Sequence, residues 1–397
     1  MAADITTYDK ALKDVYGGAP IKELNDATPL WNYIKKTSRG FDGRQFVIAT
    51  HGRRNQQIGA RALTGAGIPD KSDQDREGID NATFKPTQLL GVIHLEHSLM
   101  ESTRTNEGAF VRALRFEVES MASNFAVDFD RQIGGNGDGI LTACGTTSAS
   151  TSVVVTDSVY LETGMGVDVI VSSDGTTGTG AVGRYVSSIT STTVFVISGA
   201  AITTDSTYAV YRAGSRNNEV NGVQNMVKGS AAFGGLNPAT AGQEYWQSYI
   251  DSTTTTVTEK AFQKLFEAPQ EQKRGGGGKP NLAMTTFGVR RSYQDTLVAL
   301  KRFTAAPLRL VGGWEALDFN GLPIFADRFY KAKRIDFLTT KNLFFLQTRD
   351  PHWVEEDGSI LKWVADKVAF KGIYAWLVQF GTDARNAHSA GTTFTES

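Results

Sequence analysis

The sequence predicts an α+β fold into which a small β-sandwich or barrel domain is inserted. Three observations lead to this prediction: one very long amphipathic helical pattern, a long alternating strand pattern near the C-terminal end, and a Ser/Thr-rich run of short β-branched segments between them. The chain has 397 residues, which is enough for a large hydrophobic core. It contains 41 glycines and only 10 prolines, so many of its bends use the more permissive residue.

The composition excludes several classes of protein. The 41 Lys and Arg residues face 42 Asp and Glu residues, and a formal net charge of -1 disfavours a protein that holds nucleic acid by bulk attraction. The single cysteine, Cys144, rules out an intramolecular disulfide framework and a Cys-rich zinc site, and it fits a reducing cytosol. No apolar run approaches the roughly 18 residues that a membrane helix needs, and the first residues do not resemble a secretory signal.

Residues 1–42 are predicted to form an N-terminal arm that carries two short helices. Tyr8, Leu12 and Val15 follow one another at helical spacing. Pro29 stands at the favoured first position of the second helix, LWNYIKK. Helices this short are marginal in water, so we expect the arm to need a partner surface.

Residues 43–90 are predicted to form a long extended loop with strand-like ends and a polar, Gly-rich middle. A lone charge run is usually a solvated surface, but a loop of this length with few apolar anchors is typical of a functional segment. We therefore predict that the loop docks onto other copies of the protein. Its charged side chains form a basic and an acidic block and are the candidate intersubunit contacts: Arg44, Arg53, Arg54 and Arg61, then Asp70, Asp73, Asp75, Glu77 and Asp80.

The strongest helical signal lies in residues 107–133. Apolar residues recur there at steps of three and four from Phe110 to Phe129, Asn106 is the expected N-cap, and two glycines follow the last turn. A helix of this length extends for about 40 Å. An aromatic stripe at helical spacing is most often part of a core, and we interpret it so.

Residues 140–218 differ in character from the rest of the chain. Ser and Thr supply 26 of the 71 residues between 145 and 215, and short β-branched runs alternate with Gly-containing turns. Five strands are predicted, in SVVVT, VDVIVSS, RYVSSIT, TVFVIS and TYAVYR. Such a segment is typical of a small β-sandwich or barrel inserted at a surface loop of its host.

The remaining sequence returns to a mixed α/β pattern. Thr258 is the expected N-cap of a helix in AFQKLFEAP, KRGGGGKP is a flexible loop, and NLAMTTFGVRRSYQDTLVALKRF predicts a strand, a turn and a helix. Residues 313–397 are predicted to be rich in strands and include the long alternating stretch VAFKGIYAWLVQFG. The final residues, NAHSAGTTFTES, offer little that would order them.

Two glycine-rich motifs match phosphate-binding loops only superficially. Gly178–Gly183 fits the pattern G-x-G-x-x-G, but the β-branched sequence after it predicts a strand, whereas a pyrophosphate needs a helix N-terminus. Gly275–Lys279 lacks the spacing and the Ser or Thr of a phosphate loop. The sequence therefore predicts no cofactor.

The sequence offers no metal or catalytic motif either. His94 and His97 lie three residues apart in a predicted strand, so they face opposite sides and cannot share an ion. Asn136 and Asp138, with Asp128 and Asp130 before them, lack the spacing of a calcium loop. Asp128 and Asp130 lie at the end of the long helix and are interpreted as a solvated cap region. Because no nucleophile or metalloprotease motif is present, we predict that the protein is not an enzyme.

The order of these segments resembles that of the major capsid proteins of tailed bacteriophages, which share the Hong Kong 97 fold. Local sequence adds to the resemblance, in TTYDKALKDVYG, GRQFVIATHGRRNQQIGARALTGAGIP, EGAFVRALRFEVESM, QIGGNGDGILTA and FNGLPIFADRFY. It covers essentially the whole chain except the 145–215 insert. The regions it implies are an N-terminal arm (1–42), an extended E-loop (43–90), a peripheral domain (91–139 and 345–397) with a spine helix (107–133), an inserted surface domain (140–218) and an axial domain (219–344).

The resemblance implies a coat protein that assembles into the icosahedral shell around the double-stranded DNA genome of a tailed bacteriophage. The implied partners are copies of itself in hexamers and pentamers, a portal at one vertex, packaged DNA bound without sequence specificity, and in some members a decoration protein. Some members carry an N-terminal scaffold for which this chain has no room, so a separate scaffolding protein is expected. The implied location is the virion capsid, assembled in the host bacterial cytoplasm without membrane contact.

Three other interpretations remain open, and one of them, an unrecognised enzyme, would need a compact monomer with a pocket. An encapsulin-like compartment shell has the same fold, although the large insert and the lack of a cargo signal disfavour it. A β-rich phage tail or adhesion protein would explain the insert but not the long helix. Some capsid proteins form Lys-to-Asn crosslinks, yet nothing around Lys71 or Lys85 in the loop marks such a site.

Overall fold

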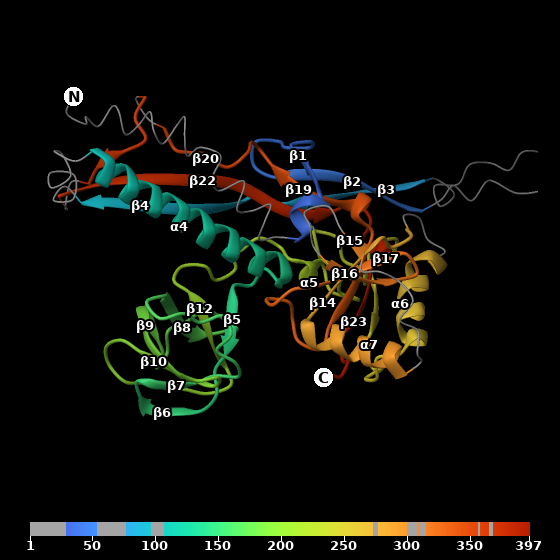
Figure 1. The fold of residues 1–397 in the computed structure, drawn as a ribbon. Coiled ribbons are helices and arrows are strands. Elements are labelled where there is room, and N and C mark those ends of the chain that lie inside the picture. The colour runs from blue at the N-terminus through green and yellow to red at the C-terminus, as the bar shows by residue number, and fades with distance from the viewer. Residues whose placement is uncertain are drawn as a thin grey trace, which may run out of the picture. The chain divides into compact units, whose positions relative to one another are not determined.

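The chain folds as two units, and the smaller one is formed by a segment from the middle of the sequence. The computed structural model describes residues 29–53, 77–96, 107–272, 277–299, 308–309, 315–355, 358–364 and 368–397. The larger unit consists of Met1–Gly134 and Val223–Ser397, and the smaller unit of Gly135–Gly222 (Figure 1).

The larger unit contains a six-stranded sheet built around one long strand. Its strands are β22 (Ala369–Thr382), β4 (Thr87–Glu96), β19 (Leu343–Gln347), β20 (His352–Trp353), β21 (Lys362–Trp363) and β1 (Lys35–Thr37). β4 runs antiparallel along one edge of β22, while β19, β20 and β21 pair in turn with its other edge. The alternating stretch predicted to be a long strand is thus confirmed as β22.

One long helix, α4 (Glu107–Gly134), packs on a face of this sheet. Its buried apolar residues recur at helical spacing: Val118, Met121, Ala122, Phe125, Phe129 and Ile133. Gly91 of β4 permits the close approach, because a Cβ atom there would lie 2.5 Å from Sδ of Met121. The helix predicted over 107–133 is therefore confirmed, with its aromatic stripe in the core.

An aromatic cluster holds the N-terminal segment against this helix and sheet. The Trp31 ring lies 5.8 Å from Phe129, 5.5 Å from Phe345 and 5.2 Å from Trp376, measured between ring centroids. Phe129 and Trp376 lie 4.7 Å apart. All four rings are buried, so residues from four distant parts of the chain share one apolar contact.

This contact explains why the second short helix expected in the arm does not form. The segment makes one 3-10 turn, η1 (Pro29–Asn32), and then continues as β1, which pairs in parallel with Phe344–Leu346. Burial of Leu30 and Trp31 and the pairing with β19 outweigh a weak local helical preference. The first helix expected in the arm, around Tyr8–Val15, lies outside the described residues.

The long loop begins and ends as a two-stranded hairpin. β2 (Phe46–Arg53) and β3 (Gly78–Phe84) are antiparallel, with Phe46 opposite Phe84 and Thr50 opposite Asp80. The two strands form a sheet of their own. The strand-like ends predicted for residues 43–90 are therefore present.

The second sheet of the larger unit has seven strands and carries two helices on one face. In spatial order the strands are β13 (Tyr249–Asp251), β23 (Ser389–Gly391), β18 (Ile335–Leu338), β14 (Leu282–Thr285), β17 (Leu322–Ala326), β16 (Glu315–Phe319) and β15 (Leu308–Arg309). The helices are α6 (Glu259–Glu271) and α7 (Phe287–Ala299); shorter helical turns are α5 (Val223–Met226), η3 (Thr340–Asn342) and η4 (Arg385–Ala387). Thr258 caps α6 as predicted, since its Oγ1 accepts a hydrogen bond from the Ala261 N–H at 3.1 Å.

The expectation that the last twelve residues would have little to order them is wrong. β23 lies between β13 and β18 in the second sheet, and Phe394 is fully buried in its core. The Glu396 carboxylate accepts hydrogen bonds from the Thr286 hydroxyl and, at 2.7 Å, from the Lys333 N–H. The order comes from partners far away in the sequence, which the polar local composition does not reveal.

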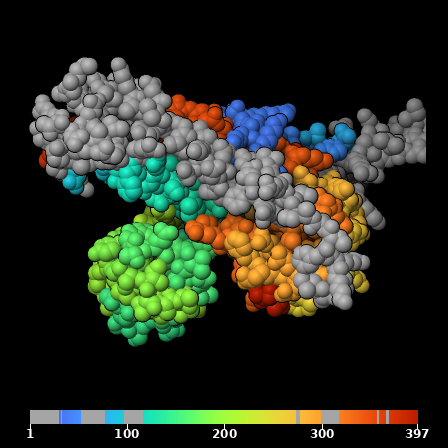
Figure 2. All heavy atoms as spheres, in the orientation of Figure 1, coloured from blue at the N-terminus to red at the C-terminus, as the bar shows by residue number. Residues whose placement is uncertain are grey.

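The smaller unit is a closed β-barrel. Its main sheet runs in the order β5 (Ile140–Ala143), β12 (Tyr208–Arg212), β8 (Gly166–Val171), β9 (Ala181–Ser191), β10 (Val194–Ile197) and β7 (Ser152–Val154). A bridge between Cys144 and Val155, with a Gly145 N–H to Val154 O hydrogen bond of 2.8 Å, joins the two outer strands. Figure 2 shows the unit as one rounded body.

The barrel encloses an apolar core and brings its two chain ends together. All five strands predicted from the sequence are present, whereas β5 and the pair β6 (Thr147–Ser150) and β11 (Ile202–Thr204) were not predicted. Burial raises the pKa of the Cys144 thiol to about 12, with Asp205 adding to the effect, so the thiol stays protonated. At the exit of the unit, Asn217 N donates to Asp138 O at 2.9 Å.

Removal of one ring from the aromatic cluster should destabilise the larger unit far more than removal of an exposed ring from the same helix. Phe129→Ala deletes a fully buried side chain and is expected to cost about 3–5 kcal/mol. Phe116→Ala, at a position 69% exposed, should cost less than about 0.5 kcal/mol. Thermal and denaturant unfolding of both variants measures the difference, and equal losses would contradict the packing described here.

Candidate functional site

The nine charged residues singled out in the long loop fall in different parts of the structure. Arg44 is exposed in the turn before β2, and Glu77 is exposed at the start of β3, where its Oε1 lies 3.5 Å from His51 Nε2. Asp80 is half-buried in β3, and Arg53 ends β2. The other five lie outside the described residues: Arg54, Arg61, Asp70, Asp73 and Asp75.

Asp80 contacts Tyr245 of the larger unit partway along the hairpin. Tyr245 Oη donates to Asp80 Oδ2 at 2.9 Å and lies 2.8 Å from Oγ1 of Thr50, the residue opposite Asp80. Thr50 Oγ1 in turn donates to the Asp80 carbonyl oxygen at 3.0 Å. One phenol from 165 residues away therefore contacts both strands of the hairpin.

The Tyr245 ring lies directly against the backbone of β2. A Cβ atom on Gly52 would lie 2.0 Å from Cε1 of this ring, so only glycine leaves room for it. Burial raises the pKa of Tyr245 to about 12, which keeps the phenol protonated and able to donate to the carboxylate. Sequence reasoning missed Tyr245 because nothing near it in the sequence points to the hairpin.

The hairpin is also held at a point nearer to the core than Tyr245. Thr83 N donates to Gly234 O at 2.8 Å, and the Phe84 and Phe233 rings lie 5.4 Å apart. Gly234 has a φ of +59°, and a Cβ atom there would lie 3.1 Å from the Phe84 ring, which adds a steric reason for glycine. Residues 225–246, which carry both contacts with the hairpin, are called the anchor segment below.

The anchor segment is gathered around one buried guanidinium, that of Arg385 in η4. Arg385 donates to the carbonyl oxygens of Met226 (2.6 Å), Trp246 (3.3 Å) and Ala231. Its guanidinium also lies 5.4 Å from the centroid of the Phe233 ring. Burial lowers the pKa of Arg385 to about 10, so the group remains a cation at neutral pH and holds several main-chain dipoles at once.

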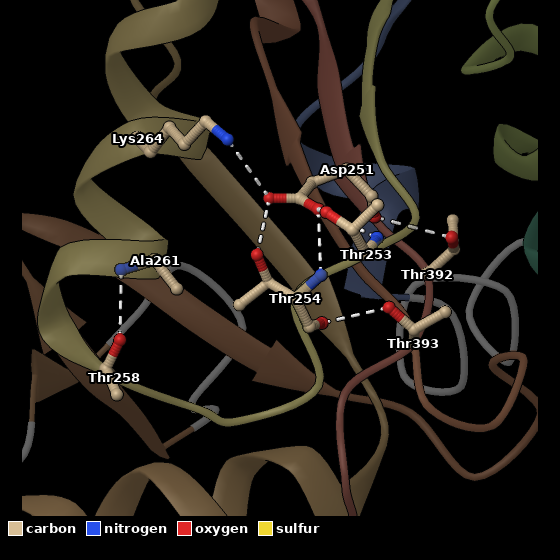
Figure 3. A network of polar contacts seen from close by, with 8 residues as sticks. All are labelled: Asp251, Thr253, Thr254, Thr258, Ala261, Lys264, Thr392 and Thr393. Atoms are coloured by element: carbon tan, nitrogen blue, oxygen red, sulfur yellow. Dashed lines mark hydrogen bonds and ion pairs between the residues drawn. The ribbon is translucent and has the colours of Figure 1, made fainter.

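A carboxylate-centred network joins β13 to the neighbouring loop, to α6 and to the C-terminal segment (Figure 3). Asp251 Oδ1 accepts from the N–H groups of Thr253 and Thr254, each at 3.0 Å, and Oδ2 lies 3.5 Å from Lys264 Nζ. Thr392 N donates to the Asp251 carbonyl oxygen at 3.0 Å. Burial alone would raise the pKa of Asp251, but the threonine hydrogen bonds hold it well below its usual range. The network is therefore a fully satisfied structural junction.

The acidic residues at the end of α4 also have partners. Asp128 lies 3.1 Å from Arg131 and accepts from the Gln132 amide at 2.9 Å. Asp130 is 7% exposed and hydrogen-bonds the carboxyl of Asp327, itself 6% exposed. The expectation of a solvated cap region is therefore wrong for Asp130, because the second sheet's connection after β17 covers it.

The other candidate motifs are placed as follows. Asn136 Nδ2 donates to Asp138 Oδ2 at 2.8 Å within a turn. A strand, β9, begins inside the Gly178–Gly183 motif and continues beyond it, so a strand and not a helix stands there, as predicted. His94 is exposed on β4, while His97 lies outside the described residues. Within the described part of the chain no group of three His, Cys, Asp or Glu residues could hold a metal ion, and no helix there is long and apolar enough to cross a membrane.

Comparisons with known proteins find similarity in solved structures. No protein-family model and no curated protein matches the sequence. The structure of the cyanophage A-1(L) capsid asymmetric unit is similar over 96% of this chain and 94% of that one, with 11% identity and a TM-score of 0.49. A structure from Mycobacterium phage Bobi covers 100% of both chains at 8% identity and a TM-score of 0.44. The SrpI encapsulin of Synechococcus elongatus covers 93% and 89%, at 9% identity and a TM-score of 0.47.

The fold class predicted from the sequence is confirmed. The chain is α+β, with an extended hairpin, a 28-residue helix on a sheet with one long strand, a second sheet carrying two helices, and an inserted barrel, in the order expected for a Hong Kong 97-like fold.

Replacement of the buried guanidinium should loosen the anchor segment. Arg385→Lys keeps the charge but cannot present a planar fork to several carbonyl oxygens, so we expect a loss of at least about 2 kcal/mol of stability. Arg328→Lys, at an exposed position, is the matched control and should change little. Denaturant unfolding measures both, and a loss in Arg385→Lys no larger than in the control would contradict this role.

The buried carboxyl pair should make stability depend on pH. Burial raises the pKa of Asp327, so its stabilising contribution is fully present below the usual carboxyl pKa and is lost as pH rises through the folded-state value. Asp327→Asn should therefore gain in melting temperature relative to the wild type as the pH rises above the usual carboxyl pKa of about 4. Asp318→Asn, exposed on β16, is the control. A pH-independent difference between Asp327→Asn and the wild type would be inconsistent with this pair.

Proposed function

We propose that the protein is a major capsid protein that assembles into the icosahedral shell around the double-stranded DNA of a tailed bacteriophage. The observation that carries the proposal is the β2–β3 hairpin, which forms a two-stranded sheet of its own instead of joining either larger sheet. The anchor segment covers part of this hairpin, but its outer residues, such as His51 and Ile79, are exposed, and a two-stranded hairpin is only marginally stable in water on its own. A further surface is therefore expected to cover it, and repeated copies of the same chain supply such a surface in a closed shell.

Exposed apolar residues on the first sheet support contact between copies. Residues that face away from α4 include Leu90 (53% exposed), Val92 (39%) and Leu377 (37%). Gln88 and Leu377 are cross-strand neighbours, as are Val92 and Ile373, so these side chains line one face. Large apolar side chains gathered on one face are typical of an interaction surface.

The remaining parts of the proposal follow from the resemblance between this sequence and capsid proteins. The hairpin and the residues it encloses would act as the E-loop, α4 as the spine helix, the second sheet with α6 and α7 as the axial domain, and the barrel as a surface domain. Partners would be hexamers and pentamers of the same chain, a separate scaffolding protein, a portal, a decoration protein and packaged DNA. The role is structural rather than catalytic, in a virion capsid assembled in the host cytoplasm, and a near-neutral net charge suits a wall that must not adhere tightly to DNA.

Assembly of the purified protein tests this proposal. Electron microscopy and analytical ultracentrifugation over a range of concentrations should show shells, hexamers or pentamers, and a 43.0 kDa monomer under all conditions would contradict it. Double charge reversal, Arg53→Glu with Arg54→Glu, should reduce assembly while leaving the circular dichroism spectrum unchanged. Lys331→Glu, at an exposed position, is the control. A single exposed ion pair contributes only about 0–1 kcal/mol, so the effect on assembly must come from repetition of the contact over the shell. Normal particles from the double variant would contradict a role of these two arginines in contacts between subunits.

A further inference from the structure

We propose that Tyr245 is a positioning residue that fixes the direction in which the hairpin leaves the subunit, and that Asp80 acts through Tyr245 rather than by pairing with a neighbouring copy. This inference rests on the proposed function, since a fixed direction matters only if the hairpin meets another copy.

Two contacts along the hairpin define its direction. The first is at the pair Phe46 and Phe84, both buried, where Phe84 meets Phe233 of the anchor segment. The second is at the pair Thr50 and Asp80, four residues further out on β2 and so about 13 Å away. A two-stranded ribbon held at one point can pivot, whereas a ribbon held at two points has a set direction.

Tyr245 makes the second contact through both its ring and its hydroxyl. The ring lies against Gly52, and the hydroxyl is within hydrogen-bond distance of Thr50 and Asp80 on the two strands. The carboxylate is an acceptor for a buried phenol, and hydrogen bonds to charged acceptors are stronger than neutral ones. Loss of the hydroxyl leaves the ring against Gly52 of β2 but removes the hydrogen bond to Asp80 of β3.

A direction set in each subunit is a requirement of symmetric assembly. In a closed shell every copy presents the same hairpin to the same surface, so an angular error at the root is repeated at every contact. Two roles of Tyr245 can therefore be measured separately. A role in positioning changes the direction of the hairpin and the formation of shells. A role in stability alone changes only the melting temperature.

The direction can be measured without assembly. Spin labels at Ile79→Cys on β3 and Lys331→Cys, both exposed positions of the larger unit, report one distance distribution across it. The only native cysteine, Cys144, is 3% exposed and so is shielded from the label. We expect a narrow distribution in the wild type and a broader or shifted one in Tyr245→Phe. An unchanged distribution in Tyr245→Phe would overturn the proposal whether or not shells form.

Matched variants then separate positioning from charge pairing. Asp80→Asn keeps an acceptor for the phenol and should assemble as the wild type does. Asp80→Leu and Tyr245→Phe each lose the hydrogen bond and should need about a tenfold higher protein concentration to assemble. A tenfold change corresponds to the free energy of roughly one such hydrogen bond. Tyr374→Phe is the control, because its buried hydroxyl has no hydrogen-bond partner among the described residues. Loss of assembly in Asp80→Asn with normal assembly of Tyr245→Phe would show that Asp80 pairs with a neighbour. If the wild type itself forms no shells, the proposed function fails, and the distance measurement still decides the role of Tyr245 in the subunit.

Discussion

The Arg385 guanidinium is a buried cation whose described hydrogen bonds go to main-chain carbonyl oxygens of the anchor segment. Burying a charge in this way is costly unless its donors are satisfied, and the planar fork of arginine can satisfy several carbonyl dipoles together. The anchor segment has little regular secondary structure of its own beyond α5, so these hydrogen bonds largely determine its path. Phe233 and Tyr245 lie on that path, and through them the position of the hairpin depends on one residue that follows β22.

Long-range side-chain contacts also hold the parts of the larger unit around its six- and seven-stranded sheets. The aromatic cluster around Trp31 unites the arm, α4, β19 and β22, while the Asp130–Asp327 pair connects the end of α4 to the loop after β17. Asp251 plays a comparable part for β13, α6 and the C-terminal segment. In each case a short stretch without much structure of its own is held by side chains from distant parts of the chain. Such stretches are therefore stable only as long as the whole unit is folded, and their local sequence contributes little to that stability.

Elements with a strong local signal could be predicted, and those that depend on distant partners could not. α4, β22 and the capped α6 carry their periodicity or their cap within a few residues, and so they were found from the sequence. β1 and β23 are three residues long and exist only because a neighbouring strand pairs with them. The hairpin was predicted from its alternating ends, but Tyr245 lies 165 residues from Asp80, and no local pattern links a tyrosine to a carboxylate at that separation. The intersubunit contacts predicted for all nine charged residues of the loop remain predictions, and five of those residues also lie outside the described part of the chain.

The hydrogen bond between Asn217 and Asp138 means that the barrel's two connections to the rest of the chain start side by side. The smaller unit, Gly135–Gly222, has 88 residues, and its own fold brings the two ends of this segment together. The larger unit therefore loses little additional chain entropy on folding, although the insertion is long. The barrel has its own core and its own hydrogen-bonded ladder, and the junction lies within its own residues. Such a module can be lost, enlarged or replaced by another domain with adjacent termini while the host fold is kept, which makes this position the natural place for sequence variation and for the display of foreign domains.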